Sequence, residues 1–338
     1  MSVKIFSTSK SIYLAEKIAT SYGLPELNKS ELKVFSDGEF CPIYKENLRG
    51  DKVFIVSSLF SSCHEIEKLI NFVPDDKKIE FYNIIKKVIS SSDSIMELLQ
   101  MIDAAKRASA SDIVAVIPYF GWARQDRKDR PRVPITAKLL ANLITNAGAT
   151  RIITIDLHAD QIQGFFDIPV DALQSSYIFI PYIESLKLKN LVMGSPDEGG
   201  GKRLKVYKKY FKSRMIFMYK DRDEANSIGE MELIGDVNGC DVVFIDDIID
   251  TAGTITTAAD ILINKKGAKS VRACIAHPVL SGNAIEKIEK SKLTELIITD
   301  TIPVCIKSEK IKVLSVSDLI SKAIYRMNNN ESISNLFK

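Results

Sequence analysis

The sequence contains few of the residues that support a disulfide scaffold, a zinc site or a thiol enzyme. Its 338 residues include five cysteines, and these are scattered, without a CxxC pair or the spacing of zinc ligands. An odd and sparse set of cysteines fits a reducing compartment, in which a free thiol behaves as a small apolar side chain. We therefore expect a soluble, cytoplasmic protein.

An excess of one charge and long apolar runs are also absent. Lys and Arg number 46 against 43 Asp and Glu, so the net charge of +3 predicts neither a nucleic-acid partner nor an anionic membrane. The apolar stretches near Val53–Cys63, Ile113–Ala123 and Ala172–Ile183 are shorter than the ~18 residues of a membrane span. The start, MSVKIFSTSK, lacks the apolar core of a signal peptide and reads as a strand.

What the chain does contain is an alternation of short β-branched runs with stretches of helical period. The runs are nearly unbroken in apolar character, which is typical of parallel strands covered on both faces. The expected strands are Val53–Ser57, Ile113–Ile117, Ile152–Asp156, Leu191–Ser195, Val242–Asp246, Val271–Ala276 and Leu296–Thr299. The expected helices are Pro134–Ala147, Lys202–Phe211 and Thr254–Lys265. This order predicts an α/β fold with parallel sheets, and the length fits two domains.

One stretch of the first half has a counterpart in the second. GATRIITIDLH (Gly148–His158) is similar to GAKSVRACIAH (Gly267–His277), and each follows a strand, a polar loop and a helix. Two copies of one α/β unit would explain this, although any two such units share some pattern. Cys63–Asp93 differs, since charges and a serine run surround one amphipathic piece, Ile79–Ile89, and we expect a surface insertion at about residues 64–92.

The strongest signal for a binding site is VVFIDDIIDTAGT (Val242–Thr254). A buried strand brings Asp246 and Asp247 to its carboxyl end, and a tight loop then leads into a helix. Backbone N–H groups of such a loop, threonine hydroxyls and a helix N-terminus together suit a phosphate group. The two acids suit the hydroxyls of a ribose or a hydrated Mg²⁺. A purely structural explanation, in which acids cap the helix, accounts for one aspartate but hardly for the whole set.

This loop resembles the phosphoribosyl pyrophosphate (PRPP) fingerprint of type I phosphoribosyltransferase folds. Four more motifs extend the resemblance over Lys4–Phe337 to the phosphate-dependent class of ribose-phosphate diphosphokinases. They are FSDGEF (Phe35–Phe40), ARQDRKDRPRVPITAKL (Ala123–Leu139), DLHADQIQGFFDIPVD (Asp156–Asp171) and SPDEGGGKR (Ser195–Arg203). The resemblance implies two tandem phosphoribosyltransferase-like α/β domains, residues 1–172 and 173–338, with a C-terminal tail that packs back. Each would have a mainly parallel central sheet flanked by helices.

The same resemblance implies an activity and its residues. The enzyme would transfer the diphosphoryl group of ATP to the C1 hydroxyl of ribose 5-phosphate, with Mg²⁺, giving PRPP and AMP. ATP would contact Phe35, Asp37, Glu39, Arg124, Gln125, Asp129 and His158. Ribose 5-phosphate would contact Asp197, Asp246, Asp247, Asp250, Thr251, Ala252, Gly253 and Thr254, and His158 and Asp197 would reach the metal. The segment YKDRDEANSIGEMEL (Tyr219–Leu233) matches a mobile catalytic loop and carries Lys220 and Arg222 as catalytic cations. Asp223 and Glu224 stand where relatives commonly have basic residues.

Assembly and regulation follow from the resemblance too. It implies a homo-oligomer, a hexamer, in which the Phe35–Phe40 loop reaches the ATP site of a neighbouring subunit. Phosphate would activate and ADP inhibit at a site between subunits. The matching positions are Arg49, Arg132, Gln163, Asp171, Ser332 and Ser334, while Asn47 and Ala172 differ from the residues often found there.

Taken one by one, several of these motifs have ordinary explanations. A lone histidine after a strand, such as His158, is more often structural, and we assign no role to its counterpart His277 or to His64. RQDRKDRPR alone could be a solvated face or a nucleic-acid patch, FSDGEF an exposed turn, and YKDRDEANSIGEMEL a charged loop.

Two alternatives to the diphosphokinase hypothesis remain at this point. One is a non-catalytic regulatory homologue that assembles with active subunits. The other is a simple phosphoribosyltransferase, which would share the Asp246–Thr254 loop but would not need two similar halves or the motifs at Phe35 and Arg124.

Overall fold

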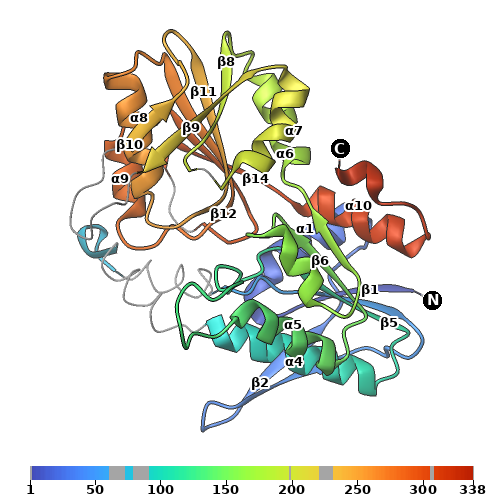
Figure 1. Ribbon diagram of the computed structural model, residues 1–338. Coiled ribbons are helices and arrows are strands. Elements are labelled where there is room, and N and C mark those ends of the chain that lie inside the picture. Colours follow the sequence, from blue (N-terminus) through green and yellow to red (C-terminus); the bar gives the residue numbers. More distant parts are fainter. Residues whose placement is uncertain are drawn as a thin grey trace. The chain divides into compact units, whose positions relative to one another are not determined.

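Two compact units make up the chain in the computed structural model (Figure 1). The structure describes residues 2–60, 73–78, 91–197, 199–220, 231–304 and 308–337. Unit 1 comprises Met1–Gln174, Thr301–Cys305 and Ser315–Phe337, and unit 2 comprises Ser175–Asp300 and Ile306–Leu314. The segment Ser315–Phe337 therefore groups with unit 1, whereas the sequence assigned it to the second domain as a tail that packs back.

Unit 1 is built on a five-stranded sheet in which every pair of neighbours is parallel. Its strands lie in chain order: β1 (Val3–Ser7), β4 (Lys52–Val56), β5 (Asp112–Ile117), β6 (Arg151–Ile155) and β7 (Val170–Leu173). The interior positions of β4, β5 and β6 are all buried. Nearly continuous apolar runs are what strands need when helices cover both faces, and the predicted parallel arrangement is confirmed.

Among the described residues of unit 1, two pairs of helices accompany this sheet. α4 (Ser91–Arg107) and α5 (Thr136–Ala147) contact each other and contribute Leu98 and Leu140 to a core that also contains Val53 and Ile113 of the strands. α1 (Ile12–Tyr22) packs on α10 (Ser317–Asn328), which brings the C-terminal segment back to the first helix. The Tyr22 and Tyr325 ring centroids lie 6.5 Å apart.

A hairpin extends from unit 1 and was not predicted from the sequence. β2 (Ser30–Val34) and β3 (Phe40–Tyr44) pair only with each other, in antiparallel register. Most of β2 is exposed, so its residues lack the apolar pattern that reveals a buried strand. The FSDGEF motif forms the turn of this hairpin, which projects at the lower edge of unit 1 in Figure 1.

The predicted insertion is only partly within the described residues. The amphipathic piece Ile79–Ile89 and His64 lie outside them. At the other end, α4 begins at Ser91 and the serine run forms its first turn. Ser94 is buried there and its hydroxyl donates a hydrogen bond to the backbone oxygen of Phe60 at 3.0 Å. Serine and aspartate are favoured at helix starts, so this run suits the first turn of α4.

Unit 2 contains a seven-stranded sheet in the order β10-β9-β8-β11-β12-β13-β14. The strands are β8 (Leu191–Ser195), β9 (Arg214–Lys220), β10 (Met231–Ile234), β11 (Asp241–Ile249), β12 (Ser270–Pro278), β13 (Glu295–Thr299) and β14 (Ile311–Leu314). All neighbours are parallel except β9 and β10, so this sheet is mixed. The helices are α6 (Ser176–Ser185), α7 (Gly201–Phe211), α8 (Gly253–Asn264) and α9 (Ala284–Lys290).

The order of strands reverses at one place in unit 2. From β8 the chain adds β9 on one side, and then returns to add β11 on the other side of β8. Connecting helices then leave opposite faces of the sheet, and a crevice opens beyond the carboxyl ends of the two strands. The described strands of unit 1 show no such reversal, because they follow one another in chain order.

All seven strands and all three helices predicted from the sequence are present, with helix ends within two residues. The similar stretches of the two halves occupy equivalent places, since β5–α5–β6 and β11–α8–β12 are each a strand, a helix and a parallel neighbouring strand. Gly148 and Gly267, which precede β6 and β12, both have positive φ, 120° and 73°.

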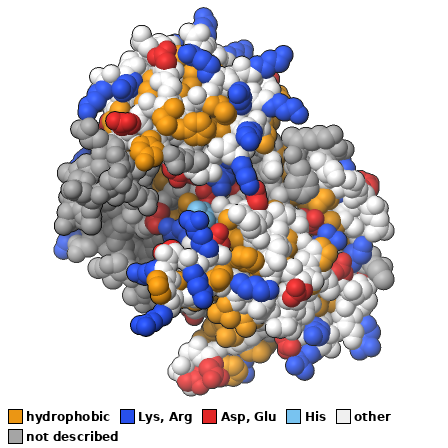
Figure 2. All heavy atoms as spheres, viewed as in Figure 1, with side chains coloured by type: hydrophobic (Ala, Val, Ile, Leu, Met, Phe, Trp, Pro, Cys, Tyr) orange, Lys and Arg blue, Asp and Glu red, His pale blue; other side chains and the backbone are white. Residues whose placement is uncertain are grey.

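Among the described residues, no helix has both the length and the apolar character needed to cross a bilayer. On the face shown in Figure 2, Lys and Arg side chains are spread over both units and mixed with acidic and hydrophobic ones. This face therefore reflects the near balance of charge in the composition.

The close packing around Gly194 predicts that one added methyl group lowers the stability of unit 2. A Cβ at Gly194 of β8 would lie 2.8 Å from ring carbons of Phe244 and 3.1 Å from Ile216. We expect Gly194→Ala to lower the free energy of unfolding by roughly 1–3 kcal/mol, because the core must shift. Denaturant unfolding measures this. Gly164→Ala, where nothing lies within 4 Å, is the control, and an equal effect of the two would contradict the packing described.

Candidate active site

Two adjacent carboxylates lie at the carboxyl end of β11, beside the reversal of strand order. β11 pairs with β8 only as far as Phe244, whereas its pairing with β12 continues to Ile249. The last part of β11 therefore has a neighbour on one edge only. Asp246 and Asp247 lie in this part, with side chains 18% and 6% exposed.

Arg203 of α7 holds this pair. Its Nη1 atom lies 3.1 Å from Oδ1 of Asp247 and 3.4 Å from Oδ1 of Asp246. The backbone N–H of Asp247 also donates to Oδ1 of Asp246 at 2.8 Å. Burial raises the pKa of the Asp246 carboxyl well above its ordinary value, the negative charge of Asp247 raises it further, and Arg203 opposes both. Buried carboxylates of raised pKa beside a crevice are typical of functional sites.

The loop after β11 leads into α8, and no side chain caps the backbone N–H groups at the start of this helix. Ala252 occupies the N-cap position of α8 with φ of 60°, and no side chain caps the helix. Alanine is among the poorest N-cap residues and rarely adopts positive φ, so the loop conformation costs stability. The first turn of α8 also contains no acidic residue. Uncapped N–H groups and the positive end of the helix dipole form a suitable place for an anion.

A second connection fixes the shape of this loop. The backbone N–H groups of Leu280 and Ser281 donate to the oxygens of Ile249 and Asp250, both at 3.0 Å, and the Ser281 hydroxyl donates to the Asp250 carboxylate. The side chain of Asp250 is therefore already engaged by the chain itself. Of the predicted loop residues, Thr251 and Thr254 are exposed, Gly253 is half-buried and Ala252 is buried.

Asp197 lies on the opposite side of the reversal, just after β8. Its Oδ1 accepts a hydrogen bond from the N–H of Gly200 at 3.2 Å. Gly200 has to lack a side chain, because a Cβ there would lie 2.2 Å from the Ser195 hydroxyl oxygen. Asp197, Asp246 and Asp247 are thus brought to the carboxyl ends of two adjacent strands, as their sequence positions predicted.

The predicted ATP residues of unit 1 lie at its surface. His158 follows the end of β6 and is exposed, as are Arg124, Gln125 and Asp129. The side-chain oxygen of Gln125 accepts a hydrogen bond from Thr136 at the start of α5. His277, the counterpart of His158, lies inside β12 with 3% of its surface exposed, so the two histidines have different environments.

Phe35, Asp37 and Glu39 form the turn of the β2–β3 hairpin. The N–H of Phe35 donates to the oxygen of Glu39 at 2.7 Å, and that of Glu39 donates to Oδ1 of Asp37 at 3.1 Å. The ring of Phe35 is 43% exposed, and Nζ of Lys33 lies 4.8 Å from its centroid. An exposed aromatic ring on a projecting turn is available to another molecule.

The predicted catalytic loop is only partly described. Lys220 is the last residue of β9 and pairs with Met231 of β10, whereas Arg222, Asp223 and Glu224 lie outside the described residues. The predicted site residues form two groups, one on unit 1 and one on unit 2.

Three of the six predicted regulatory residues line one cavity of unit 1, of about 470 Å³. Asp171 contributes from β7, and Ser332 and Ser334 from the C-terminal segment, where their hydroxyl oxygens lie 3.0 Å apart. Arg49, Arg132 and Gln163 are exposed and do not line this cavity. The cavity also contains Arg151, whose Nη1 lies 2.9 Å from Oδ2 of Asp171.

Arg203 and Arg151 are the site residues that sequence reasoning missed. Arg203 belongs to SPDEGGGKR, but nothing in the spacing shows that it reaches carboxylates more than 40 residues away. Arg151 is the first residue of β6 and resembles any charged strand end.

Comparisons with known proteins agree with this geometry. Residues 3–148 match the model of the N-terminal domain of ribose phosphate pyrophosphokinase, and residues 218–338 match that of the phosphoribosyl synthetase-associated domain. The ribose-phosphate pyrophosphokinase of Porphyromonas gingivalis is 50% identical over 334 residues, covering 98% of this chain and 97% of the relative. The chain belongs to the ribose-phosphate pyrophosphokinase family.

Further relatives extend the match over the whole chain. The ribose-phosphate pyrophosphokinase of Campylobacter jejuni is 46% identical over 334 residues, covering 99% of this chain and 98% of the relative. Among solved structures, the phosphoribosylpyrophosphate synthetase of Mycobacterium smegmatis aligns with a TM-score of 0.82 at 31% identity, covering 98% of this chain and all of that one. The predicted family and fold class are confirmed.

The raised pKa of Asp246 predicts that its charge lowers stability. A carboxyl with a folded pKa above its unfolded value binds more protons when folded, so stability decreases as pH rises from about 4 toward the folded pKa. Asparagine cannot ionise, and Arg203 keeps Asp247. We expect the free energy of unfolding of Asp246→Asn to exceed that of the wild type by roughly 1 kcal/mol at pH 8, and by less at pH 4.5.

Denaturant unfolding at the two pH values measures this difference. Asp167→Asn, which changes an exposed carboxylate, serves as the control and should change stability little at either pH. An Asp246→Asn protein that is less stable than the wild type at pH 8 would contradict the argument.

Proposed function

We propose that this protein, acting in the cytoplasm, transfers the diphosphoryl group of ATP to ribose 5-phosphate and releases PRPP and AMP. The C1 hydroxyl oxygen attacks the β-phosphorus in line. The bond from the β-phosphorus to the oxygen that bridges to the α-phosphate breaks, and AMP leaves with that oxygen. The observation that carries the proposal is the buried carboxylate pair beside an uncapped helix start, in a chain of this family.

Unit 2 supplies the ribose 5-phosphate site in this proposal. Asp246 and Asp247 accept hydrogen bonds from the ribose hydroxyls, while Arg203 limits the repulsion between them. The N–H groups of residues 251–254 and the threonine hydroxyls hold the 5-phosphate. Asp197 faces the substrate from the other side of the strand reversal. Positioning of this kind is the main contribution that a phosphoryl-transfer enzyme makes.

Unit 1 supplies most of the ATP site. Arg124 stacks on the adenine, Gln125 and Asp129 line the pocket, and His158 contacts the nucleotide. Phe35 covers the other adenine face, with Asp37 and Glu39 beside it, from the hairpin of a neighbouring subunit. The exposed ring at the tip of a projecting hairpin supports this arrangement, which requires a homo-oligomer, and we propose a hexamer.

The family is ATP-dependent and generally needs a metal, and the residues present fit Mg²⁺. This ion commonly takes one or two carboxylates, keeps several waters and uses substrate phosphates for the rest. Asp197 is an exposed carboxylate with one oxygen free of the Gly200 N–H, and His158 is the second proposed contact. No group of three or more His, Cys, Asp or Glu within the described residues could form a complete protein cage. Mg²⁺ would neutralise charge on the triphosphate.

Lys220 and Arg222 are the proposed catalytic cations. They offset the charge that develops on the migrating group, and loss of such a group costs about 10²–10³ in turnover. The regulatory homologue has no support from this geometry, because a subunit without catalysis has no need for the buried, destabilising carboxylates. A simple phosphoribosyltransferase would not explain relatives named ribose-phosphate pyrophosphokinase over the full length.

The decisive assay is release of AMP from ATP with and without ribose 5-phosphate, in Mg²⁺ and phosphate. We expect release to depend on ribose 5-phosphate and to fall about 10²–10³-fold in Lys220→Ala. Lys208→Ala, an exposed lysine of α7, should retain activity. A folded wild-type protein that releases no AMP under these conditions would refute the proposed function.

We further propose that inorganic phosphate activates and ADP inhibits at the regulatory residues of the sequence. Asp171, Ser332 and Ser334 share a cavity that Arg151 and Lys52 also line. Replacing both serines by alanine should raise the phosphate concentration for half-maximal activation about tenfold or more, since two hydroxyl donors are lost. Activity titrated with phosphate measures this. Ser185→Ala, at the end of α6, is the control, and an unchanged activation curve in the double variant would exclude the role.

A further inference from the structure

The loop proposed to bind the 5-phosphate contains no cation. Residues Asp250–Thr254 include one carboxylate, and Asp246 and Asp247 lie just upstream. Arg203, the cation on that side, is already within 3.4 Å of both upstream carboxylates. A phosphate group with up to two negative charges must therefore be bound close to three aspartates. The partial charge at the start of α8 offsets part of this repulsion, and a full positive charge nearby would offset more of it.

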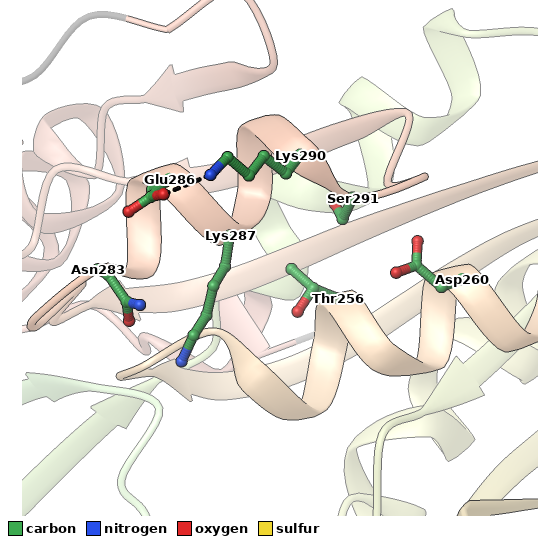
Figure 3. Close-up of a pocket in the computed structure, with 7 residues that line it drawn as sticks. All are labelled: Thr256, Asp260, Asn283, Glu286, Lys287, Lys290 and Ser291. Carbon is green, nitrogen blue, oxygen red and sulfur yellow. Dashed lines mark hydrogen bonds and ion pairs between the residues drawn. The ribbon is translucent and has the colours of Figure 1, made fainter.

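Lys287 of α9 lies where that charge is needed. Its Nζ atom donates a hydrogen bond to the backbone oxygen of Thr251 at 3.3 Å, and lies 4.0 Å from the place of a Cβ at Gly253. Figure 3 shows its side chain extending from α9 toward the start of α8. Lys290 points elsewhere and pairs with Glu286 at 2.5 Å. Within the described part of the chain, Lys287 forms no ion pair.

The place of Lys287 is fixed by the same contacts that shape the loop. Leu280 and Ser281, just before α9, donate backbone hydrogen bonds to Ile249 and Asp250, just before the loop. α9 and the loop are therefore joined through their connections. Beside them, α8 and α9 border a cavity of about 230 Å³, lined in part by Thr256, Asn283 and Lys287. This space gives the lysine side chain room to turn.

We infer that Lys287 is a further binding residue for ribose 5-phosphate, whose ammonium group contacts the 5-phosphate in the Thr251–Thr254 loop. This inference rests on the proposed function. An ammonium group has three donors, so Nζ can keep its bond to Thr251 and donate another to the phosphate. Charge-assisted hydrogen bonds of this kind are stronger than neutral ones. A lysine that only held the loop would act through the shape of the backbone and would not need its charge near the ligand.

The test is direct binding of ribose 5-phosphate by calorimetry, to the full-length protein, at low and high salt. We expect Lys287→Met to weaken binding about tenfold and to reduce its salt dependence, while KM for ATP stays unchanged. Lys287→Arg, which keeps the charge, should bind within about threefold of the wild type. Lys290→Met is the control. It removes a charge of the same helix, one that pairs with Glu286, and should bind ribose 5-phosphate as the wild type does.

The results distinguish a contact between Lys287 and the phosphate from a role in the shape of the loop. Equal binding by Lys287→Met and Lys290→Met would overturn the inference. So would weaker binding by Lys287→Met with the salt dependence of the wild type, because it indicates a role in loop shape alone. Thermal unfolding of every variant detects a folding defect, in which case Lys287→Gln repeats the comparison. A wild-type protein that does not bind ribose 5-phosphate would instead refute the proposed function, whatever the variants do.

Discussion

The candidate site depends on the burial of two negative charges at the end of β11. Asp246 and Asp247 are adjacent in sequence and largely removed from water, an arrangement that is unfavourable without a counter-charge. Arg203 supplies it from α7, and the pairing of β11 with β8 ends before the two carboxylates. The short β8, the long β11 and the start of α7 are all needed to create this one arrangement. The site is therefore a property of the strand reversal rather than of one motif.

The two units use similar pieces in different ways. β5–α5–β6 and β11–α8–β12 have the same order and pairing, and each ends near a histidine. In unit 1 the strand stops at Ile155, so His158 lies beyond it and is exposed. In unit 2 the strand continues to Pro278 and buries His277. A difference of a few residues in strand length thus decides whether the same side chain is available to a ligand.

Sequence reasoning succeeded where the signal is local. Buried parallel strands are apolar on both faces, so runs such as Ile113–Ile117 and Val271–Ala276 were readily found, as were helices of regular period. The β2–β3 hairpin was missed because its first strand has no buried face.

Long-range relations could not be read from the sequence. The roles of Arg203 and Lys287 depend on which helix lies beside which loop, and the grouping of α10 with α1 joins opposite ends of the chain. The carboxylates and the 251–254 loop were predicted because strand, acids and helix follow one another within a few residues. The cations that balance them come from other helices.

The return of α10 to unit 1 has a consequence for how the protein is made. The hydroxyl oxygens of Ser21 in α1 and Ser317 in α10 lie 3.4 Å apart, although 296 residues separate them. At synthesis rates of about 5–20 residues per second, α1 leaves the ribosome about 15–60 s before its partner helix exists. During this time all of unit 2 is synthesised and can fold. Unit 1 is therefore completed only after unit 2 has been synthesised, because α10 follows unit 2 in the chain and packs on α1.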